Sequence, residues 1–459
     1  LSALAFIMFT SGTTGRSKGV MLSQKNLFSA MPAFLDPFDD VKKYTGWNTD
    51  EFSSLSALPM FHISAMTSLV SWSITGHSIN LCNNLKYFYR DLGAMHSEVM
   101  AVVPVLLKSI YSDVMKGRRD RLNGLCVLTC GAAMFDPKML SDMMEKGFFV
   151  AQMYGLTETC GDGAWNSSQE AKYLTSVGHV DLSCEYKLDD GELCMRGDPI
   201  MLGYYKDPEG TAEVIDADGW FHTGDIARVE EDGYMYLTGR KKNVIILDSG
   251  ENVSPEELEK LLVPCADIQE CIVKEKDKKI CALIYCDTAK QDAVKEFVTG
   301  VNRGLPLYKR MVPELSAQPL PRNAMGKLLA SCCASKGRKE EMDMNGTEPQ
   351  NLYELVTRNM EQRFADRAAF RWYDEAADVV RCRTYRECAQ DIRRAVRYFQ
   401  STVPEVHGKR ICLWSNNSYA YAVNCYGIML AGGVVVPLNQ RKSWDELSYE
   451  LQLVEPAAI

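Results

Sequence analysis

A loop rich in glycine and hydroxyl groups, placed directly after an apolar strand, constrains this chain most. Residues 4–9 form an apolar run, and residues 10–19 read TSGTTGRSKG. Glycines let a backbone approach an anion closely, while hydroxyl groups, N–H groups and the Lys18 ammonium supply hydrogen-bond donors and positive charge. The spacing differs from the common Gly-x-x-x-x-Gly-Lys-Ser/Thr nucleotide loop. Taken alone, the segment fits a polyphosphate-binding loop or an ordinary flexible surface loop.

Composition narrows the class of protein. A length of 459 residues is enough for two or three domains with real cores. The net charge of −9 argues against a nucleic-acid-binding surface. The 16 cysteines are scattered without a Cys-x-x-Cys pair, and only 6 histidines are present, so we expect apolar core cysteines in a reducing cytoplasm rather than metal ligands.

The sequence also predicts how the chain relates to membranes. Its first residues show no basic leader followed by an apolar segment, so we expect no signal peptide. The longest apolar region, residues 421–438, is broken by glycines and by Pro437. This pattern predicts a helix, a turn and a buried strand rather than a membrane span. Peripheral membrane contact stays open.

Three further segments follow the first loop along the chain. They are MYGLTET at 153–159, GWFHTGDIA at 219–227 with YLTGRKKN at 236–243, and PRNAMGK at 321–327. With the first loop they resemble the motif set of the adenylate-forming superfamily, which includes acyl-CoA synthetases, luciferases and peptide-synthetase adenylation domains. The resemblance spans nearly all of residues 1–330. It implies an α/β fold, with a large domain of stacked sheets covered by helices and a small α+β lid.

The resemblance also implies an activity. Family members use ATP and Mg²⁺ to convert a carboxylic acid to acyl-AMP with release of pyrophosphate, and then form a thioester with coenzyme A. Two anions must be brought together, so neutralising charge is the main task of such a site. A nucleotide-binding but inactive protein, and an adenylating enzyme that loads a carrier protein, remain alternatives.

The phosphate-binding residues follow from the resemblance alone. The positions that match the phosphate loop are Thr10, Ser11, Gly12, Thr13, Thr14, Gly15 and Lys18. The family usually has proline directly before this lysine, where the present chain has Ser17. The substitution predicts a slightly looser loop that still binds phosphates.

The adenine and magnesium positions are implied in the same way. Tyr154 matches the residue that packs on adenine, although alone it would be taken for a core aromatic. The remaining adenine-loop positions are Gly155, Gly131, Ala132 and Ala133. Thr157 and Glu158 match the contacts to the α-phosphate and to magnesium. A single carboxylate with phosphate oxygens and waters is a typical environment for Mg²⁺.

The remaining implied site residues lie on either side of these motifs. Asp225 and Arg240 match two ribose contacts, and Lys327 matches the lysine that assists adenylation by offsetting charge. Gly250 matches a loop that lies against the coenzyme A thiol tunnel. His62, in LPMFHISA, matches an aromatic–histidine pair beside the acyl pocket, with no acid nearby to bind an α-amine. The segment GRKKNVIILDSGENVSPEELE at 239–259 looks most like long-chain fatty-acyl-CoA synthetases, and GELCMRG at 191–197 and MLGYY at 201–205 fit the same resemblance, so we expect a medium- or long-chain fatty acid.

The order of the parts differs from that of the family. Residues 351–459 resemble the family's beginning, although they follow the lid. We therefore expect a permuted arrangement, with 1–242 and 351–459 in the large domain, 243–333 as the lid and 334–350 as a polar linker. A family segment between the region of Ile459 and that of Leu1 has no counterpart. Two joined gene fragments would explain the order equally well, and a native species starting at Met342 or Met344 would exclude a single permuted chain.

Overall fold

The computed structural model divides into two compact units. Unit 1 comprises Leu1–Glu185, Arg196–Gly219 and Lys339–Ile459, and unit 2 comprises Tyr186–Met195 and Trp220–Arg338. The structure describes residues 2–10, 17–31, 40–43, 52–131, 135–180, 183–241, 245–246, 252–276, 279–320, 349 and 351–459. The sequence predicts a boundary between the large domain and the lid at residues 242 and 243, and this boundary remains a prediction.

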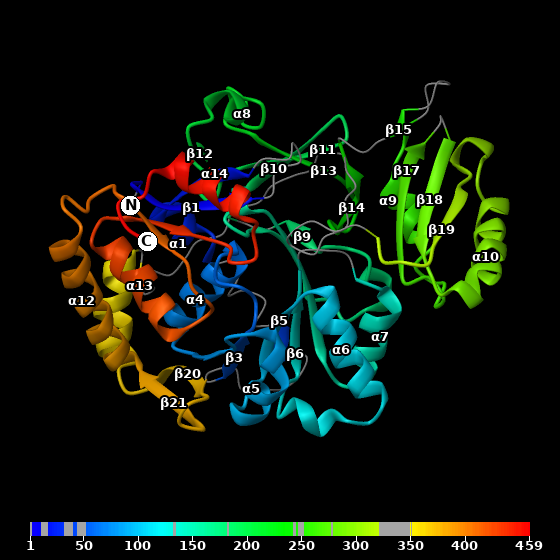
Figure 1. Ribbon diagram of the computed structural model, residues 1–459. Helices are drawn as coiled ribbons and strands as arrows, with labels where there is room; N and C mark the ends of the chain where they lie inside the picture. The colour runs from blue at the N-terminus through cyan, green and yellow to red at the C-terminus, as the bar shows by residue number, and fades with distance from the viewer. Residues whose placement is uncertain are drawn as a thin grey trace. The chain divides into compact units, whose positions relative to one another are not determined.

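The largest sheet of unit 1 has nine strands in the order β21-β20-β4-β3-β5-β6-β7-β8-β9 (Figure 1). Their bounds in this order are Val379–Thr384, Ala368–Asp374, Ser78–Leu81, Ser53–Ser56, Val99–Val102, Val127–Cys130, Phe149–Gly155, Gly163–Asn166 and His179–Val180. The strands from β20 to β7 are parallel, whereas β21, β8 and β9 are antiparallel additions at the two edges. Parallel strands buried on both faces need apolar residues throughout, and β6 is wholly buried.

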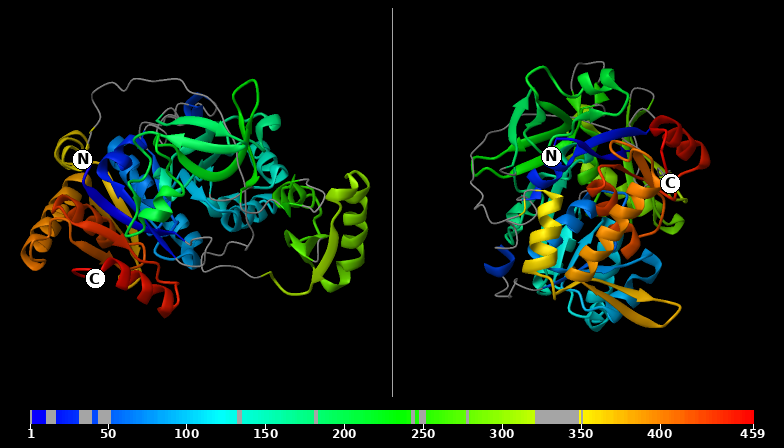
Figure 2. Two further views of the ribbon diagram at one scale, coloured as in Figure 1. Left: turned by 90° about the horizontal axis from the view of Figure 1, so that it is seen from above. Right: turned by 90° about the vertical axis from the view of Figure 1, so that its left-hand side faces the viewer.

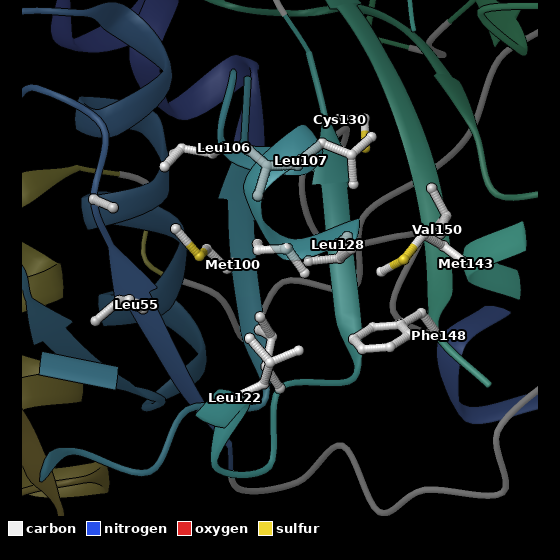
Figure 3. Packing of buried hydrophobic residues seen from close by; sticks show 14 of the residues in the cluster. Leu55, Met100, Leu106, Leu107, Leu122, Leu128, Cys130, Met143, Phe148 and Val150 are labelled. Carbon is white, nitrogen blue, oxygen red and sulfur yellow. The ribbon is translucent and has the colours of Figure 1, made fainter. Parts of the chain in front are cut away.

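Helices complete this layer. The helices α4, α5, α6 and α7 span Ile63–Thr75, Phe88–Ala94, Pro104–Met115 and Pro137–Glu145. Leu106 and Leu107 of α6 share one core cluster with Met100 of β5, Leu128 of β6 and Val150 of β7 (Figure 3). This core fixes the ends of β6 and β7, which carry the expected adenine-binding positions.

A second sheet of unit 1 draws its strands from both ends of the chain. Its order is β12-β2-β1-β23-β22, with bounds Gly203–Tyr204, Lys18–Ser23, Leu4–Thr10, Val434–Pro437 and Arg410–Leu413. Strand β1 pairs with β23 in parallel, Phe6 opposite Val435. The strand predicted at residues 4–9 and the helix–turn–strand pattern predicted at 421–438 are both confirmed. The turn between helix and strand needs Gly432, whose φ is +87°.

Hydrogen bonds also join residues 351–459 to the N-terminal part of unit 1. The buried hydroxyl of Tyr385 donates to the carbonyl oxygens of Trp72 and His77, at 2.9 and 2.6 Å. The side chain of Asn359 donates to the carbonyl of Ile74 at 2.7 Å. Tyr385 is the first residue of helix α12, at Tyr385–Thr402. Helices α13 and α14 follow, at Tyr419–Leu430 and Trp444–Val454. Residues 351–459 are thus an integral part of unit 1 (Figure 2).

Unit 2 is a smaller α+β body. A four-stranded sheet runs β10-β11-β13-β14, with bounds Glu185–Asp189, Glu192–Arg196, Phe221–Val229 and Met235–Arg240. A three-stranded sheet of β17, β18 and β19 spans Glu270–Lys276, Lys279–Tyr285 and Val312–Ser316, and packs with helices α9 at Pro255–Lys260 and α10 at Gln291–Arg303. Strands β15 and β16, at Ile245–Ile246 and Asn252–Val253, form a short ribbon.

The other elements are short. They are α1 at Gln24–Ser29, α8 at Pro208–Ala212, α11 at Leu352–Glu354, a π-helical segment at Leu355–Arg363, and 3-10 turns at Leu85–Tyr87, Arg119–Leu122, Thr157–Thr159, Ala171–Tyr173, Thr288–Lys290 and Leu307–Lys309. Across the described ranges, no helix combines the length and apolar character that crossing a membrane requires. All the cysteines in those ranges are free thiols.

Candidate active site

The predicted phosphate loop connects two paired strands. Thr10 ends β1 and pairs with Lys18 at the start of the antiparallel strand β2. The other predicted phosphate-loop residues, namely Ser11, Gly12, Thr13, Thr14 and Gly15, lie outside the described residues. The Lys18 ammonium lies 4.3 Å from the centre of the Tyr204 ring and 3.6 Å from a carboxylate oxygen of Asp207. Its side chain is 24% exposed, which leaves it accessible to a ligand.

Tyr204 connects this lysine to the predicted magnesium ligand. Its hydroxyl donates to Glu158 Oε1 at 3.0 Å. Burial and the neighbouring Glu158 carboxylate raise the pKa of Tyr204, so the hydroxyl keeps its proton and remains a donor. Lys18, Tyr204 and Glu158 therefore form one continuous group. Sequence reasoning did not single out Tyr204, although it lies in the MLGYY segment that resembles the family.

The turn that carries Thr157 and Glu158 is fixed by its backbone. The two residues lie in the 3-10 turn Thr157–Thr159, and the N–H of Met201 donates to the carbonyl of Glu158 at 2.8 Å. A carboxylate and a hydroxyl are the hard oxygen donors that Mg²⁺ prefers. The chemistry of this pair therefore fits the predicted magnesium site.

The predicted adenine-binding positions converge at the ends of β6 and β7. Tyr154 is 9% exposed, and Gly155 lies opposite Gly163 on β8. A Cβ on Gly155 would lie 2.2 Å from the carbonyl oxygen of Gly161, so only glycine fits this approach. Gly131 follows β6 and lies against Met153, the neighbour of Tyr154. Ala132 and Ala133 lie outside the described residues.

The two predicted ribose contacts are paired within unit 2. Asp225 and Arg240 are cross-strand partners on β13 and β14, with Arg240 Nε 2.6 Å from Asp225 Oδ1. The aspartate side chain is 6% exposed and the arginine side chain 37%. Burial and the ion pair hold the Asp225 carboxylate in one orientation, which suits an acceptor for neighbouring hydroxyl groups.

Glu192 supports the strand that carries Asp225. This buried carboxylate accepts hydrogen bonds from the Gly224 N–H at 3.2 Å, from His222 Nδ1 at 2.8 Å, and from Lys241. Burial alone would raise the pKa of Glu192, but the hydrogen bonds from Lys241 and His222 outweigh it and lower that pKa. The charged carboxylate thus fixes the backbone of β13 just before Asp225. Glu192 was not identified from the sequence, although this residue lies in the segment GELCMRG at 191–197.

His62 precedes α4 close to the C-terminal segment. Burial and, to a smaller extent, the positive charges of Arg441 and Lys442 together lower its pKa to about 4, so the imidazole is neutral at pH 7. A cavity of about 20 Å³, lined by residues of β3 and α4 that include Ser56 and Trp72, has room for a group about the size of a water molecule. Arg441 and Lys442 thus place two positive charges near His62, the predicted acyl-pocket histidine.

Two predicted residues lie outside the described residues. Gly250 and Lys327 belong to the undescribed ranges 247–251 and 321–348. Their roles stay predictions from the resemblance.

Comparison with known proteins identifies a family and several relatives of this chain. The model of the family "AMP-binding enzyme" matches residues 1–205 and 357–459. Among curated relatives, a 2-succinylbenzoate–CoA ligase of Bacillus pumilus is 30% identical over 353 residues, covering 73% of this chain and 70% of the relative. The peroxisomal OPC-8:0-CoA ligase 1 of Arabidopsis thaliana is 27% identical, covering 71% and 62%, and a long-chain-fatty-acid–CoA ligase of Mycobacterium tuberculosis is 29% identical, covering 71% and 66%.

Solved structures give the same fold. The o-succinylbenzoate CoA synthetase of Bacillus subtilis, in complex with its acyl-adenylate intermediate, superposes with a TM-score of 0.58 at 25% identity, covering 71% of this chain and 67% of that one. The same enzyme with ATP and a magnesium ion gives 0.55 at 26% identity, covering 71% and 68%. The chain spans slightly less than two thirds of the first curated relatives it matches.

The matched stretches are also the segments that the structure brings together. They supply β1, β2 and β12 from one side of the sequence and β22 and β23 from the other, and these strands form the single sheet beside Lys18 and Tyr204. Because the match covers more than half of the chain, this protein belongs to the AMP-binding enzyme family.

Proposed function

We propose that this protein is an AMP-forming acyl-CoA ligase. The observation that carries the proposal is the group formed by Lys18, Tyr204 and Glu158, in which a cation and a carboxylate are joined through one tyrosine. A triphosphate with its magnesium ion needs both signs of charge within a short distance. The three relatives described above are each a CoA ligase, which supports the same reaction class.

In the first step, a carboxylate oxygen of the substrate attacks the α-phosphorus of ATP. A new O–P bond forms, the bond to the β-phosphate oxygen breaks, and pyrophosphate leaves with the electron pair. Lys18 offsets the negative charge of the departing phosphates, and the Thr157 hydroxyl holds the α-phosphate. Glu158 would hold a magnesium ion, which would neutralise charge on the triphosphate. Tyr204 keeps Glu158 oriented by its hydrogen bond.

Unit 2 carries further residues with proposed roles in the reaction. The Asp225 carboxylate accepts hydrogen bonds from the ribose hydroxyls, and Arg240 holds that carboxylate in place. Lys327 supplies a cation during adenylation. In the second step the coenzyme A thiolate attacks the acyl carbonyl carbon. A C–S bond forms, the bond between that carbon and the phosphate oxygen breaks, and AMP leaves with the electron pair; Gly250 lies in the loop proposed to lie against the thiol.

The proposed substrate is a medium- or long-chain fatty acid. Neutral His62 with the positive charge of Arg441 nearby favours an anionic carboxylate over a zwitterionic amino acid. The long-chain ligase of Mycobacterium tuberculosis supports this class, whereas the succinylbenzoate ligase widens it to aromatic acids.

A substrate panel tests the proposal. Purified protein is given ATP, Mg²⁺ and a series of fatty acids and aromatic acids, and pyrophosphate release and hydroxylamine-trapped adenylate are measured. We expect both signals with at least one acid, and thioester only after coenzyme A is added. A Lys18→Ala variant is the matched control and should lose about 10²–10³-fold in rate. ATP binding without pyrophosphate release for any acid would overturn the ligase and favour a nucleotide-binding protein without catalysis.

A further inference from the structure

A buried ammonium lies at the base of the predicted phosphate loop. The side chain of Lys442 is 4% exposed and pairs with Glu450, whose side chain is fully buried on α14. The ammonium donates a hydrogen bond to Ser17 Oγ at 2.9 Å. It also lies 5.7 Å from the centre of the Phe9 ring. Lys442 thus contacts β1 just before the loop and the residue that directly precedes β2.

The pair is poorly suited to a purely stabilising role. Burying two charges costs free energy that their attraction often only balances. Burial raises the pKa of Glu450, although Lys442 and Ser17 oppose that rise. Within the part of the chain that the structure describes, Glu450 Oε2 is buried without a hydrogen-bond partner, which adds a further cost. A function at the loop explains why such a pair lies there.

The residue that Lys442 holds is also the one at which the loop departs from the family pattern. A proline at position 17 would restrict the backbone dihedral φ and stiffen the loop, whereas serine leaves it free. A hydrogen bond from a buried, paired ammonium supplies a comparable restraint from outside the loop. The partner of Ser17 comes from 425 residues further along the chain.

We propose that Lys442, held by Glu450, is a positioning residue that fixes the exit of the phosphate loop through Ser17. The proposal rests on the proposed function, because it assigns the benefit to binding of a triphosphate. Ordering Ser17 before ATP arrives aims the following residue, Lys18, and reduces the conformational entropy lost on binding. Lys442 acts through Ser17 and does not itself contact the nucleotide.

The test replaces the ion pair with apolar side chains of similar volume, Lys442→Met with Glu450→Leu. We expect the KM for ATP to rise about tenfold, which corresponds to about 1.4 kcal/mol, with the kcat and the KM for the acid nearly unchanged. The Tm should stay the same or rise, because a buried ion pair is removed as a whole. Ser17→Ala alone should raise the KM for ATP similarly, and should add little in the double variant. The matched control is Glu455→Gln, which removes the exposed pair between Glu455 and Lys206 just beyond α14.

A second measurement separates this proposal from the proposed function. Hydrogen exchange of residues 10–19 in nucleotide-free protein should be faster in the Lys442→Met/Glu450→Leu variant than in wild type, and unchanged in Glu455→Gln. This measurement needs no enzymatic activity. A wild-type protein that fails to use ATP would end the ligase proposal, while the exchange data would still decide whether Lys442 positions Ser17. Unchanged exchange, or faster exchange with an unchanged KM for ATP in an active enzyme, would overturn the positioning role.

Discussion

The two units are built in different ways from the same chain. In unit 1, the sheet beside Lys18 joins strands from both ends of the sequence, as the pair Phe6 and Val435 shows. In unit 2, the three-stranded sheet and its helices come from one continuous stretch between residues 255 and 316. A change in the order of segments therefore leaves unit 2 held by contacts between residues close in sequence. Unit 1, in contrast, depends on contacts between residues far apart in sequence.

The difference also divides the proposed chemistry. Unit 1 holds the groups matched to phosphate, adenine and magnesium, and unit 2 holds those matched to ribose and the adenylation lysine. Long-range pairing forms only after a large loss of chain entropy, which makes unit 1 the part that is harder to assemble. Four measurements test this difference between the two units.

Removing one core side chain from each unit has the largest expected effect. Phe370 on β20 is fully buried, and the strand pairs with β4 from the other side of the sequence. Phe370→Ala should cost about 3–5 kcal/mol, and Leu258→Ala in unit 2 about 2–5 kcal/mol. Peptide-resolved hydrogen exchange should show the first loss throughout unit 1, including residues 78–81, and the second within unit 2. If either variant accelerates exchange equally in both units, they unfold as one body and the contrast fails.

The adenylation lysine should separate the two half-reactions. Lys327→Ala should slow acyl-adenylate formation about 10²–10³-fold, or about 2.7–4 kcal/mol, because a cation at the developing charge is lost. Thioester formation from supplied acyl-adenylate should be spared. The measurements are pyrophosphate release and acyl-CoA yield, with Lys336→Ala in the predicted linker as the control. Equal loss in both half-reactions would refute the division of labour.

Tyr204→Phe tests the connection inside unit 1. Losing a hydrogen bond to a charged carboxylate should cost about 1.5–3 kcal/mol in binding of the magnesium–nucleotide complex. We expect a higher KM for ATP and a higher Mg²⁺ concentration at half-maximal rate, measured by titration. Tyr205→Phe is the neighbouring control. Asp225→Asn in unit 2 should raise the KM for ATP without changing the Mg²⁺ requirement. A Tyr204→Phe variant with normal titrations would exclude its orienting role.

The smallest expected effect, about 1.4 kcal/mol per pH unit, has opposite signs in the two units. Burial lowers the pKa of His77 to about 3, with a smaller contribution from Arg367. Its stabilisation of unit 1 is therefore present above its ordinary value of 6.5 and is lost as the pH falls toward 3. Burial raises the pKa of Glu259 to about 7, with a smaller contribution from Glu256, so its stabilisation of unit 2 is present below 4.5 and is lost as the pH rises through 7.

Two variants isolate these opposite responses. His77→Phe preserves the stacking on Phe52, whose ring centre is 3.7 Å away, and should flatten the acid-side loss in unit 1. Glu259→Gln should flatten the response of unit 2. Unit-resolved hydrogen exchange between pH 4.5 and 7 provides the measurement. The same slope before and after substitution would show that other groups dominate.

The sequence predicted local features best. The strand at residues 4–9, and the helix, glycine turn and strand at 421–438, are set by hydrophobic periodicity and by a residue that tolerates positive φ, so both were correct. The family followed from ordered motifs. Tyr204 and Lys442 were not identified, because a tyrosine in a short segment and a lysine far along the chain carry no pattern that reveals their partners.

The sequence by itself determined the strand at residues 4–9, the family and the residues matched to ATP, because each depends on residues close together in the chain. Only the tertiary structure decided which distant groups meet. The approach of Lys442 to Ser17, the link from Lys18 through Tyr204 to Glu158, and the pairing of Asp225 with Arg240 arise from sheet register and burial. These contacts depend on how strands pair across the whole chain, and no local spacing specifies that pairing.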